Sequence, residues 1–557
     1  MTPGIKMKST LVVLITLIFI LSCESTKYDL VIKNGTVIDG SGSVGRKTDI
    51  GVVNGKITAV TDNLTGQGIV EIDASGQVVC PGFIDILSWA MGPIIYDGEV
   101  PSVVHQGITT AVFGEGWSMG PVNDNVRMEM DNFWKEYNIT YEWETLADYL
   151  KYIEHKGTSV NIASFVGATT IRIYVIGFED RQATAEEMQQ MKNLVRREME
   201  SGALGLATSL VYTPAFYADT EELIELSKIA SEYDGIYISH LRGEGANLLE
   251  AIQELLKISK EANIPAEIYH FKAAGNDNWH LLDKAIAMIV NAHKEGLDIT
   301  ADIYPYIAGA TQLDAMLPPW SKEGGNTAMV ERLKDKSLRE RIRNDILSGN
   351  SDWENFYKMA GGGQGILVSY LSEKNKEFQG KTIAGIATLM QKDEITTIFD
   401  LLIDEQGFGG GIYFLMSEEN LRKKLKLPWV SFCTDEDAYR PTGKMSQRNP
   451  HPRAYGTFPR ILGKYVREEQ VLTLQEAIRK MTSLPAARLG LTDRGLLKKG
   501  RAADIVIFNP TTVIDKATYT APHQFPEGIN HVIVNGELVV KEGKHTGAKP
   551  GKALFKR

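Results

Sequence analysis

The chain has 557 residues, of which 43% are apolar and 23% charged, a composition typical of a large globular protein. Its formal net charge of −10 argues against a nucleic-acid partner, because such partners favour a basic protein face. We therefore expect one large catalytic domain with accessory parts.

The N-terminus has the features of an export signal. Two lysines precede an apolar run over residues 11–21, and Ser22-Cys23 follows. The run is shorter than the roughly 20 residues that span a bilayer. Ile20-Leu21-Ser22-Cys23 resembles the bacterial lipobox, which implies cleavage and acylation at Cys23. We expect residues 1–23 to be a lipoprotein-type signal peptide and the protein to be lipid-anchored in the cell envelope, on the periplasmic or outer-membrane face. The alternative is an uncleaved membrane anchor.

Both ends of the remaining chain are rich in short strands. Residues 27–77 and 500–557 contain apolar, β-branched runs separated by turns. Asn-Gly pairs, which favour tight hairpins, occur at Asn34-Gly35, Asn54-Gly55 and Asn535-Gly536. The two ends are therefore predicted to pair into one small β-sandwich that flanks the long middle part.

The middle part, residues 78–499, alternates strands and helices. Between the strands lie amphipathic helices, such as the one that begins with the capping box at Thr184 and ends near Gly202. This alternation predicts an α/β fold, and eight strands favour a closed (β/α)₈ TIM barrel. Residues 314–425 separate the last two strands and are predicted to form an inserted subdomain. The predicted strands are 78–86, 108–114, 160–167, 203–208, 236–240, 266–270, 298–304 and 429–435.

Two cysteines, Cys80 and Cys433, lie inside apolar, strand-like runs. They could form one disulfide, but buried free thiols are the simpler expectation for such positions.

Metal-binding side chains gather at the carboxyl ends of the predicted strands, where barrels carry their active sites. Glu115 follows the second strand, His240 ends the fifth and His270 ends the sixth. Two imidazoles and a carboxylate match the three protein ligands of a catalytic zinc site. Asp435, at the end of the eighth strand, is predicted to be the acid/base residue that moves the proton of the attacking water.

Ordered stretches along residues 28–550 resemble the amidohydrolase superfamily and, within it, the D-aminoacylase (N-acyl-D-amino-acid deacylase) group. They are "VIKNGTVIDGSG", "VCPGFID", "GITTAVFGEG", "SGALGLATSLVYTP", "YISHLRGE", "IYHFKAAG", "ADIYPYIAGAT", "NPHPRAYGTFPRIL" and "KGRAADIVIFNP". The resemblance implies that His240 and His270 are metal ligands and that Asp435 is catalytic. It also implies that Lys272 grips the substrate carboxylate, and we expect Arg242 to assist it.

The same resemblance implies further substrate contacts. Tyr212 and Tyr304 match tyrosines on the substrate side, and Tyr413 and Met416 match pocket residues on the insertion. His451 and Arg453 are further substrate-binding candidates from their position in "NPHPRAYG"; the alternative is that they hold a loop.

Three departures from the family pattern stand out. Leu87 and Trp89 replace the two histidines expected after the first strand, so we expect one metal ion rather than two. Glu115 replaces a cysteine ligand, and this harder ligand makes Mn²⁺ or Fe²⁺ possible beside Zn²⁺. Ala310 replaces a serine of the pocket, so the substrate contacts are expected to differ.

The resulting hypothesis is hydrolysis of the amide bond of N-acyl-D-amino acids by water that the metal activates. A second hypothesis keeps the fold and metal but assigns a cyclic amide, ureide or dipeptide as substrate. A third, prompted by Leu87 and Trp89, is a catalytically inactive, lipid-anchored binding protein.

Overall fold

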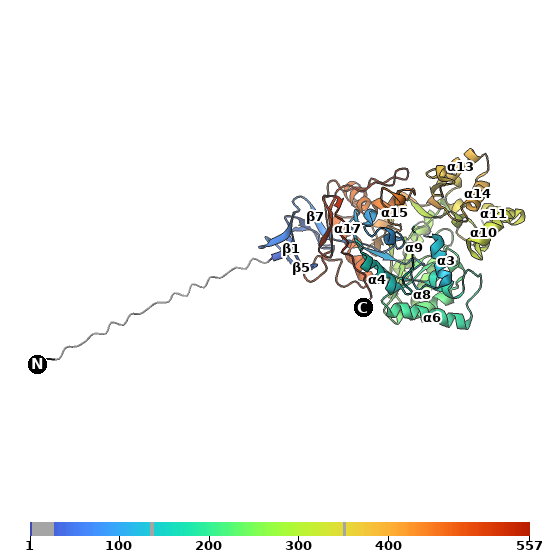
Figure 1. Cartoon of the computed structure of the whole chain (residues 1–557). Coiled ribbons are helices and arrows are strands. Elements are labelled where there is room, and N and C mark those ends of the chain that lie inside the picture. The colour runs from blue at the N-terminus through green and yellow to red at the C-terminus, as the bar shows by residue number, and fades with distance from the viewer. Residues whose placement is uncertain (3–26, 134–136, 138, 349–352, 557) are drawn as a thin grey trace.

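The computed structural model describes residues 1–2, 27–133, 137, 139–348 and 353–556. Cys23 and nearly all of the predicted signal peptide lie outside these residues. Within the described ranges, no helix combines the length and apolar character needed to cross a bilayer. In Figure 1 the β-rich ends of the chain lie on one side, the barrel in the middle and the inserted helices on the opposite side.

The predicted barrel is confirmed. Its strands run parallel, and the third is broken into two halves, β10 and β11, around Phe165. The last strand meets the first through Thr434, whose N–H donates to Asp85 Oδ1 at 2.8 Å. The barrel strands are β8 (Phe83–Asp85), β9 (Ile108–Phe113), β10 (Asn161–Ser164), β11 (Val166–Gly167), β12 (Gly205–Ser209), β13 (Ile236–His240), β14 (Ala266–Ile268), β15 (Ile299–Ile303) and β19 (Val430–Phe432).

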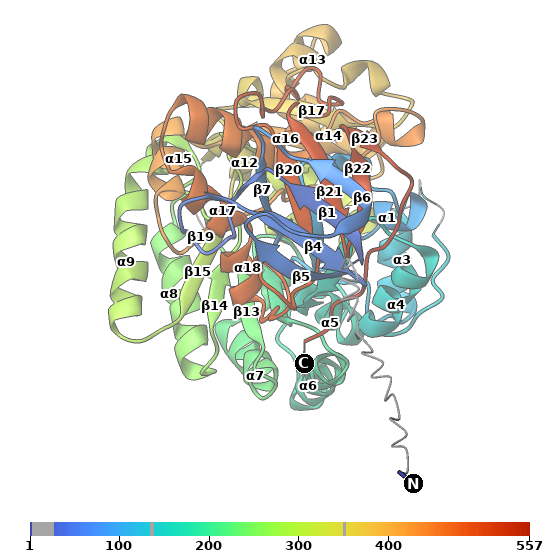
Figure 2. The same ribbon diagram turned by 90° about the vertical axis from the view of Figure 1, so that its left-hand side faces the viewer.

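Helices cover the outside of the barrel, and Figure 2 shows α6 to α9 following one another around it. The predicted capping box is present at the start of α6, where the Thr184 side chain accepts the N–H of Glu187 and the Glu187 side chain accepts the N–H of Thr184. The main covering helices are α4 (Leu146–Lys156), α5 (Ala168–Val175), α6 (Ala185–Glu200), α7 (Thr220–Ser231), α8 (Leu248–Glu261), α9 (Leu282–Lys294) and α17 (Leu474–Met481).

The run at 78–86, predicted as one strand, is two. Its first half, β7 (Val78–Pro81), pairs with terminal strands, and only the second half, β8, enters the barrel. The break falls at Gly82, where a Cβ would lie 2.1 Å from Thr109 Oγ1. Because only a residue without a side chain fits beside Thr109, the backbone can pass here from one sheet to the other.

Strands from both ends of the chain share one seven-stranded sheet, in which β20 pairs with β7. A four-stranded sheet from the N-terminal segment packs beside it through an apolar cluster that includes Ile32, Ile50 and Ile505. In order, the large sheet contains β23 (Lys544–His545), β22 (Glu537–Lys541), β21 (Ile529–Val534), β20 (Ile505–Phe508), β7, β2 (Thr36–Val37) and β3 (Arg46–Lys47). The smaller one contains β5 (Lys56–Thr61), β4 (Asp49–Val53), β1 (Lys27–Lys33) and β6 (Gln67–Asp73).

The segment between β15 and β19 forms a separate sheet with its own helices. Its first strand starts before residue 314, the predicted start of the insertion. The sheet has the order β16 (Ala308–Gln312), β18 (Gly410–Phe414) and β17 (Ile366–Tyr370). The helices are α10 (Gly325–Lys334), α11 (Lys336–Ser348), α12 (Phe356–Met359), α13 (Ile383–Met390) and α14 (Glu394–Asp404).

Shorter helices complete the structure, and the two cysteines, Cys80 and Cys433, are buried free thiols as expected. The α-helices are α1 (Pro93–Tyr96), α2 (Pro101–Val104), α3 (Asp124–Phe133), α15 (Glu418–Leu425), α16 (Arg453–Arg460) and α18 (Ser483–Arg488). The 3₁₀ turns are η2 (Ala215–Tyr217), η3 (Asn276–Leu281), η4 (Leu313–Met316), η5 (Pro319–Lys322), η6 (Gly363–Gly365), η7 (Lys376–Phe378) and η8 (Lys444–Ser446), and η9 (Ile461–Glu468) is π-helical.

Candidate metal centre and active site

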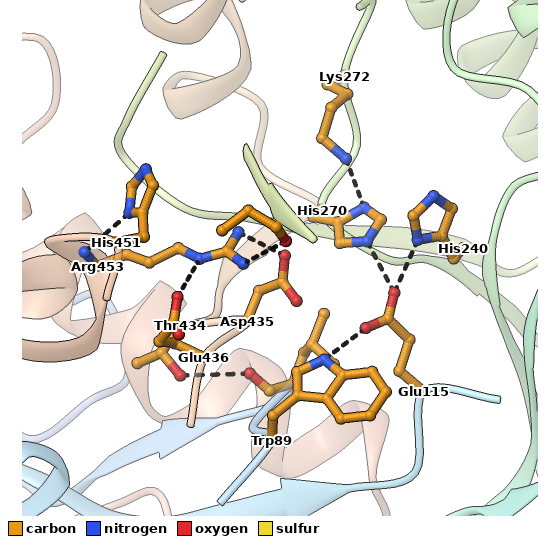
Figure 3. A network of polar contacts seen from close by, with 12 residues as sticks. Trp89, Glu115, His240, His270, Lys272, Thr434, Asp435, Glu436, His451 and Arg453 are labelled. Atoms are coloured by element: carbon orange, nitrogen blue, oxygen red, sulfur yellow. Dashed lines mark hydrogen bonds and ion pairs between the residues drawn. The ribbon is translucent and has the colours of Figure 1, made fainter. Parts of the chain in front are cut away.

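Three buried side chains converge at the carboxyl end of the barrel. Glu115 Oε1 lies 2.8 Å from His240 Nδ1 and 2.9 Å from His270 Nε2 (Figure 3). One ligand atom from each residue lies within 4.8 Å of the other two. The three predicted ligands are therefore brought together, and a carboxylate with two imidazoles is a donor set that suits a divalent metal.

The outward-facing nitrogens of both histidines point to a second carboxylate, Glu244. Its Oε1 lies 3.1 Å from His270 Nδ1, and its Oε2 lies 3.6 Å from His240 Nε2. A carboxylate behind a histidine commonly orients the ring and raises its basicity when the other nitrogen binds a metal. This arrangement fits a metal in front of the rings. Sequence reasoning missed Glu244, although its place four residues after His240 was a usable signal.

Lys272, which the resemblance assigns to the site, lies beside the Glu244 carboxylate. Its Nζ is 2.6 Å from Glu244 Oε1 and 2.7 Å from His270 Nδ1. Burial opposes ionisation of Glu244, but Lys272 and the two histidines outweigh it and hold the pKa of Glu244 well below its usual value. Glu244 is therefore ionised at neutral pH.

The backbone is strained at two of the site residues. His270 has a φ of 33° and Asp435 a φ of 51°, values that non-glycine residues rarely adopt. The His270 N–H donates to Asp302 Oδ1 at 2.8 Å, and the Asp435 N–H donates to the Leu87 carbonyl at 2.9 Å. These bonds hold the two side chains toward the site at the cost of backbone strain, as is common where geometry serves function.

Asp435 faces the candidate metal ligands and forms an ion pair with Arg453. Arg453 Nη1 donates to Asp435 Oδ2 at 2.6 Å, and Arg453 Nε donates to Glu436 Oε2 at 3.1 Å. Burial raises the pKa of Asp435 to about 6, although Arg453 lowers it and Glu115 raises it further. A carboxylate of this pKa can accept and return a proton near neutral pH.

Two predicted tyrosines flank the ligands. The ring of Tyr212 meets the ring of His240 edge-on at 5.3 Å between centroids. The ring of Tyr304 lies 4.5 Å from the Arg453 guanidinium carbon and 5.8 Å from Lys272 Nζ. Both side chains therefore border the metal ligands and Asp435.

Arg242 is not brought together with the candidate metal ligands, and its contact with a substrate carboxylate stays a prediction. Its Nε and Nη2 bind Glu254 of α8 at 2.9 and 3.0 Å, and its remaining contacts are to the carbonyls of Phe216 and Ala218. The side chain therefore turns outward from the strand end and ties the loop after β13 to the helices.

His451 holds a loop in this structure, and its contact with substrate stays a prediction. It is fully buried, and burial together with Arg453 lowers its pKa well below the usual value, so its ring is neutral. Its Nδ1 accepts the N–H of Arg453 at 3.0 Å at the start of α16. His451 therefore fixes the segment that carries Arg453.

Of the two predicted pocket residues on the insertion, Tyr413 lies in β18 and Met416 follows two residues after its end. The Tyr413 hydroxyl donates to the Gln312 carbonyl at 2.9 Å, and its ring packs against Phe356 inside the insertion. Met416 is buried, and its backbone N–H donates to the Ile307 carbonyl at 2.9 Å. Their contact with substrate stays a prediction.

Known proteins match the chain over nearly its whole length. The sequence profile of the amidohydrolase family matches residues 442–540. D-aminoacylase from Alcaligenes xylosoxydans xylosoxydans is 32% identical over 533 residues, which are 95% of this chain and 98% of the relative. N-acyl-D-aspartate deacylase from the same organism is 32% identical over 529 residues, which are 94% of this chain and 95% of the relative.

Solved structures agree with these relatives. A D-aminoacylase structure, described in terms of one-metal activation and second-metal attenuation of a binuclear centre, has a TM-score of 0.78 at 30% identity and covers 95% of this chain and 100% of its own. N-acyl-D-glutamate deacylase from Bordetella bronchiseptica, complexed with zinc and a phosphonate inhibitor, has a TM-score of 0.80 at 28% identity with the same coverage. L-hydantoinase from Arthrobacter aurescens shares the fold at 14% identity.

The full-length similarity and the ligands gathered at the barrel mouth lead to one assignment. The chain belongs to the D-aminoacylase group of the amidohydrolases, which are metal-dependent enzymes that hydrolyse carbon–nitrogen bonds.

Proposed function

We propose that this protein removes the acyl group from N-acyl-D-amino acids, with one divalent ion, Zn²⁺ in the first instance, held by Glu115, His240 and His270. The observation that carries the proposal is the position of Asp435, which faces a buried carboxylate–imidazole cluster and is held there by Arg453. The relatives named D-aminoacylase and N-acyl-D-aspartate deacylase support the choice of substrate class.

The chain's own residues divide the reaction between them. When bound, the metal supplies Lewis-acid polarisation of the amide carbonyl and lowers the pKa of water. Asp435 Oδ2 accepts a hydrogen bond from Arg453, so we assign the moving proton to Oδ1. Asp435 takes this proton from the attacking water and delivers it to the amide nitrogen, which leaves as the amine of the amino acid.

Recognition of the substrate carboxylate falls to the cations around Tyr304. Lys272 and Arg453 both contact this ring, and both are buried. Each is already paired with a carboxylate, Lys272 with Glu244 and Arg453 with Asp435 and Glu436. A substrate carboxylate would therefore share these cations rather than neutralise isolated ones, so binding is expected to be modest but orienting.

Leu87 and Trp89, which stand after the first barrel strand where the family pattern has histidines, support the choice of one ion. Leu87 has no ligand atom in its side chain, and the indole N–H of Trp89 is a donor that cannot bind a metal. The oxygen ligand Glu115 also accommodates Mn²⁺ or Fe²⁺. Metal analysis of the purified protein is expected to give about one ion per chain.

The rival substrates have weaker support. The hydantoinase-type structures, whose names point to cyclic amides, are similar at only 14% identity and so speak for the fold alone. An inactive binding protein is not favoured either, because the three ligands and Asp435 are assembled in one buried site.

The decisive experiment compares matched N-acetyl-D- and N-acetyl-L-amino acids, followed by amine release. We expect turnover of the D series and a loss of about 10²- to 10⁴-fold in kcat for Asp435→Asn, with metal content unchanged. Asp437→Asn, which changes a carboxylate in the same loop, is the matched control and is expected to keep most activity. Equal turnover by Asp435→Asn and the wild type would refute the role of Asp435, and hydrolysis of the L series alone would refute the substrate class.

We also propose that the mature protein is lipid-anchored through Cys23 in the bacterial cell envelope. The basic, apolar and lipobox-like segments at residues 6–23 support this. Metabolic labelling with a fatty acid is expected to mark the wild type and not Cys23→Ala. Labelling of both proteins would contradict it.

A further inference from the structure

The two oxygens of the Glu115 carboxylate have different partners. Oε1 faces both imidazoles, whereas Oε2 accepts the indole N–H of Trp89 at 2.8 Å (Figure 3). Glu115 is only 3% exposed, so bulk solvent has little access to Oε2. The indole therefore decides which oxygen is turned toward the histidines.

Trp89 is itself fixed by the segment that carries Asp435. Its backbone N–H donates to the Glu436 carbonyl at 2.9 Å, and Asp435 in turn donates its N–H to the Leu87 carbonyl. In Figure 3 the indole lies between Glu115 on one side and Thr434 and Glu436 on the other. The loop after β8 therefore connects the carboxylate ligand to the proposed acid/base residue.

Loss of this donor would leave a buried carboxylate oxygen without a partner. An unsatisfied buried polar group costs about 1–3 kcal/mol, and more when it is charged. The Glu115 side chain would then be free to rotate, and Oε1 would no longer be held in one direction toward the histidines. Partners of this kind behind a metal ligand commonly set metal affinity.

We propose that Trp89 is a positioning residue of the metal centre. Its N–H holds Oε2, so that Glu115 offers Oε1 alone to a single metal, and its ring closes the side of the carboxylate on which another cation could share the charge. The proposal deepens the function proposed above and rests on the metal site assigned there. It implies that the indole matters only because the ligand is a carboxylate with a second oxygen.

The first test measures Zn²⁺ affinity of the full-length protein by competition with a chromogenic chelator, without substrate. Trp89→Phe keeps an aromatic ring but removes the N–H, and we expect Zn²⁺ to bind about 10- to 100-fold more weakly. Trp320→Phe is the matched control, because Trp320 Nε1 also donates to a carboxylate, Asp345 Oδ2, at 2.8 Å, but inside the insertion. It is expected to leave the affinity unchanged. Unchanged affinity in Trp89→Phe would overturn the proposal.

A double-mutant cycle with Glu115→Cys separates positioning from packing. A thiolate is a zinc ligand with one donor atom and no second oxygen to hold. Trp89→Phe is therefore expected to cost less than about 3-fold in the Glu115→Cys background, against about 10- to 100-fold in the wild-type background. An equal loss in both backgrounds would show that the indole only fills space and would overturn the proposal.

A spectroscopic measurement covers the case in which Glu115→Cys fails to fold. The absorption bands of Co²⁺-loaded wild type and Trp89→Phe report the ligand field directly, and we expect them to differ while those of Trp320→Phe match the wild type. Identical bands in all three would overturn the proposal. Failure of the D-amino-acid assay with normal Zn²⁺ binding would instead count against the proposed function and leave the role of Trp89 standing.

Discussion

Buried charges alternate in sign around the mouth of the barrel. Lys272 pairs with Glu244, which backs the two histidines, and these face Glu115. Across the site, Asp435 pairs with Arg453. Lys272 with Glu244 and Arg453 with Asp435 are thus pairs of buried opposite charges within hydrogen-bonding distance, which is the condition for keeping ionised groups away from water.

Removing the Glu244 carboxylate tests whether these paired charges support metal binding. We predict that Glu244→Ala weakens Zn²⁺ binding about 10- to 100-fold, because both histidines lose the carboxylate behind them. Chelator competition measures this, and Glu250→Ala, an exposed carboxylate of the same segment, is the control. The double variant Glu244→Ala/Lys272→Met decides between two roles. Recovery of wild-type affinity there would mean that Glu244 only offsets the charge of Lys272.

At this scale the sequence predicted which side chains meet at the barrel mouth, but not the residues that hold them in place. His240 ends β13, and Glu115, His270 and Asp435 lie two or three residues beyond the ends of their strands, so the barrel topology brings all four to one mouth. Glu244 had a usable signal in its place four residues after His240, but the indole of Trp89 acts through a loop conformation that no local pattern encodes. The orientation of Arg242 depends on its loop in the same way, because it follows His240 by two residues yet turns outward to Glu254.

At the scale of elements, the insertion supports the metal centre from outside the barrel. Glu354, just before α12, accepts the N–H groups of Glu244 and Gly245 at 2.9 and 3.0 Å with one carboxylate oxygen. Burial raises the pKa of Glu354 to about 7, despite the backbone hydrogen bonds that lower it. The loop that carries Glu244 is therefore shaped by a residue about a hundred positions later, a dependence invisible in the sequence around His240.

Strand prediction succeeded where an apolar run belongs to one sheet and failed where it belongs to two. Runs such as 236–240 match β13, in which every residue is buried because a strand of a parallel barrel is covered on both faces. The run at 78–86 is equally apolar, and every residue of both β7 and β8 is buried. Hydrophobicity therefore cannot mark the change of sheet, which depends on the close approach of Gly82 to Thr109.

At the scale of the whole molecule, the end of the chain closes the barrel on the side opposite the metal. Beyond β23 the chain runs along the start of β10, with Gly551 donating to Thr158, Ile162 to Lys552 and Leu554 to Ile162 through backbone groups. Lys556 adds a fourth backbone bond to Gly202. These contacts lie at the amino ends of the strands, which in such barrels serve stability rather than catalysis.

Truncation after Lys549 is therefore predicted to lower stability without changing the active site. The four backbone hydrogen bonds alone, at about 1 kcal/mol each, correspond to a fall in Tm of about 3 °C for a chain of this size, and the side-chain contacts of residues 550–556 add to it. Of the four backbone bonds, truncation after Phe555 removes only the one from Lys556, together with the side-chain bond from Lys556 to the Asp234 carbonyl, and should lower Tm by about 1 °C. Calorimetry measures both shifts, while Zn²⁺ affinity and kcat are expected to stay within about 2-fold of the full chain, because the ligands and Asp435 lie at the other end of the strands. Loss of metal binding on truncation after Lys549, with Tm unchanged, would mean that the two ends of the barrel are coupled. Its amino-terminal face would then do more than stabilise the fold.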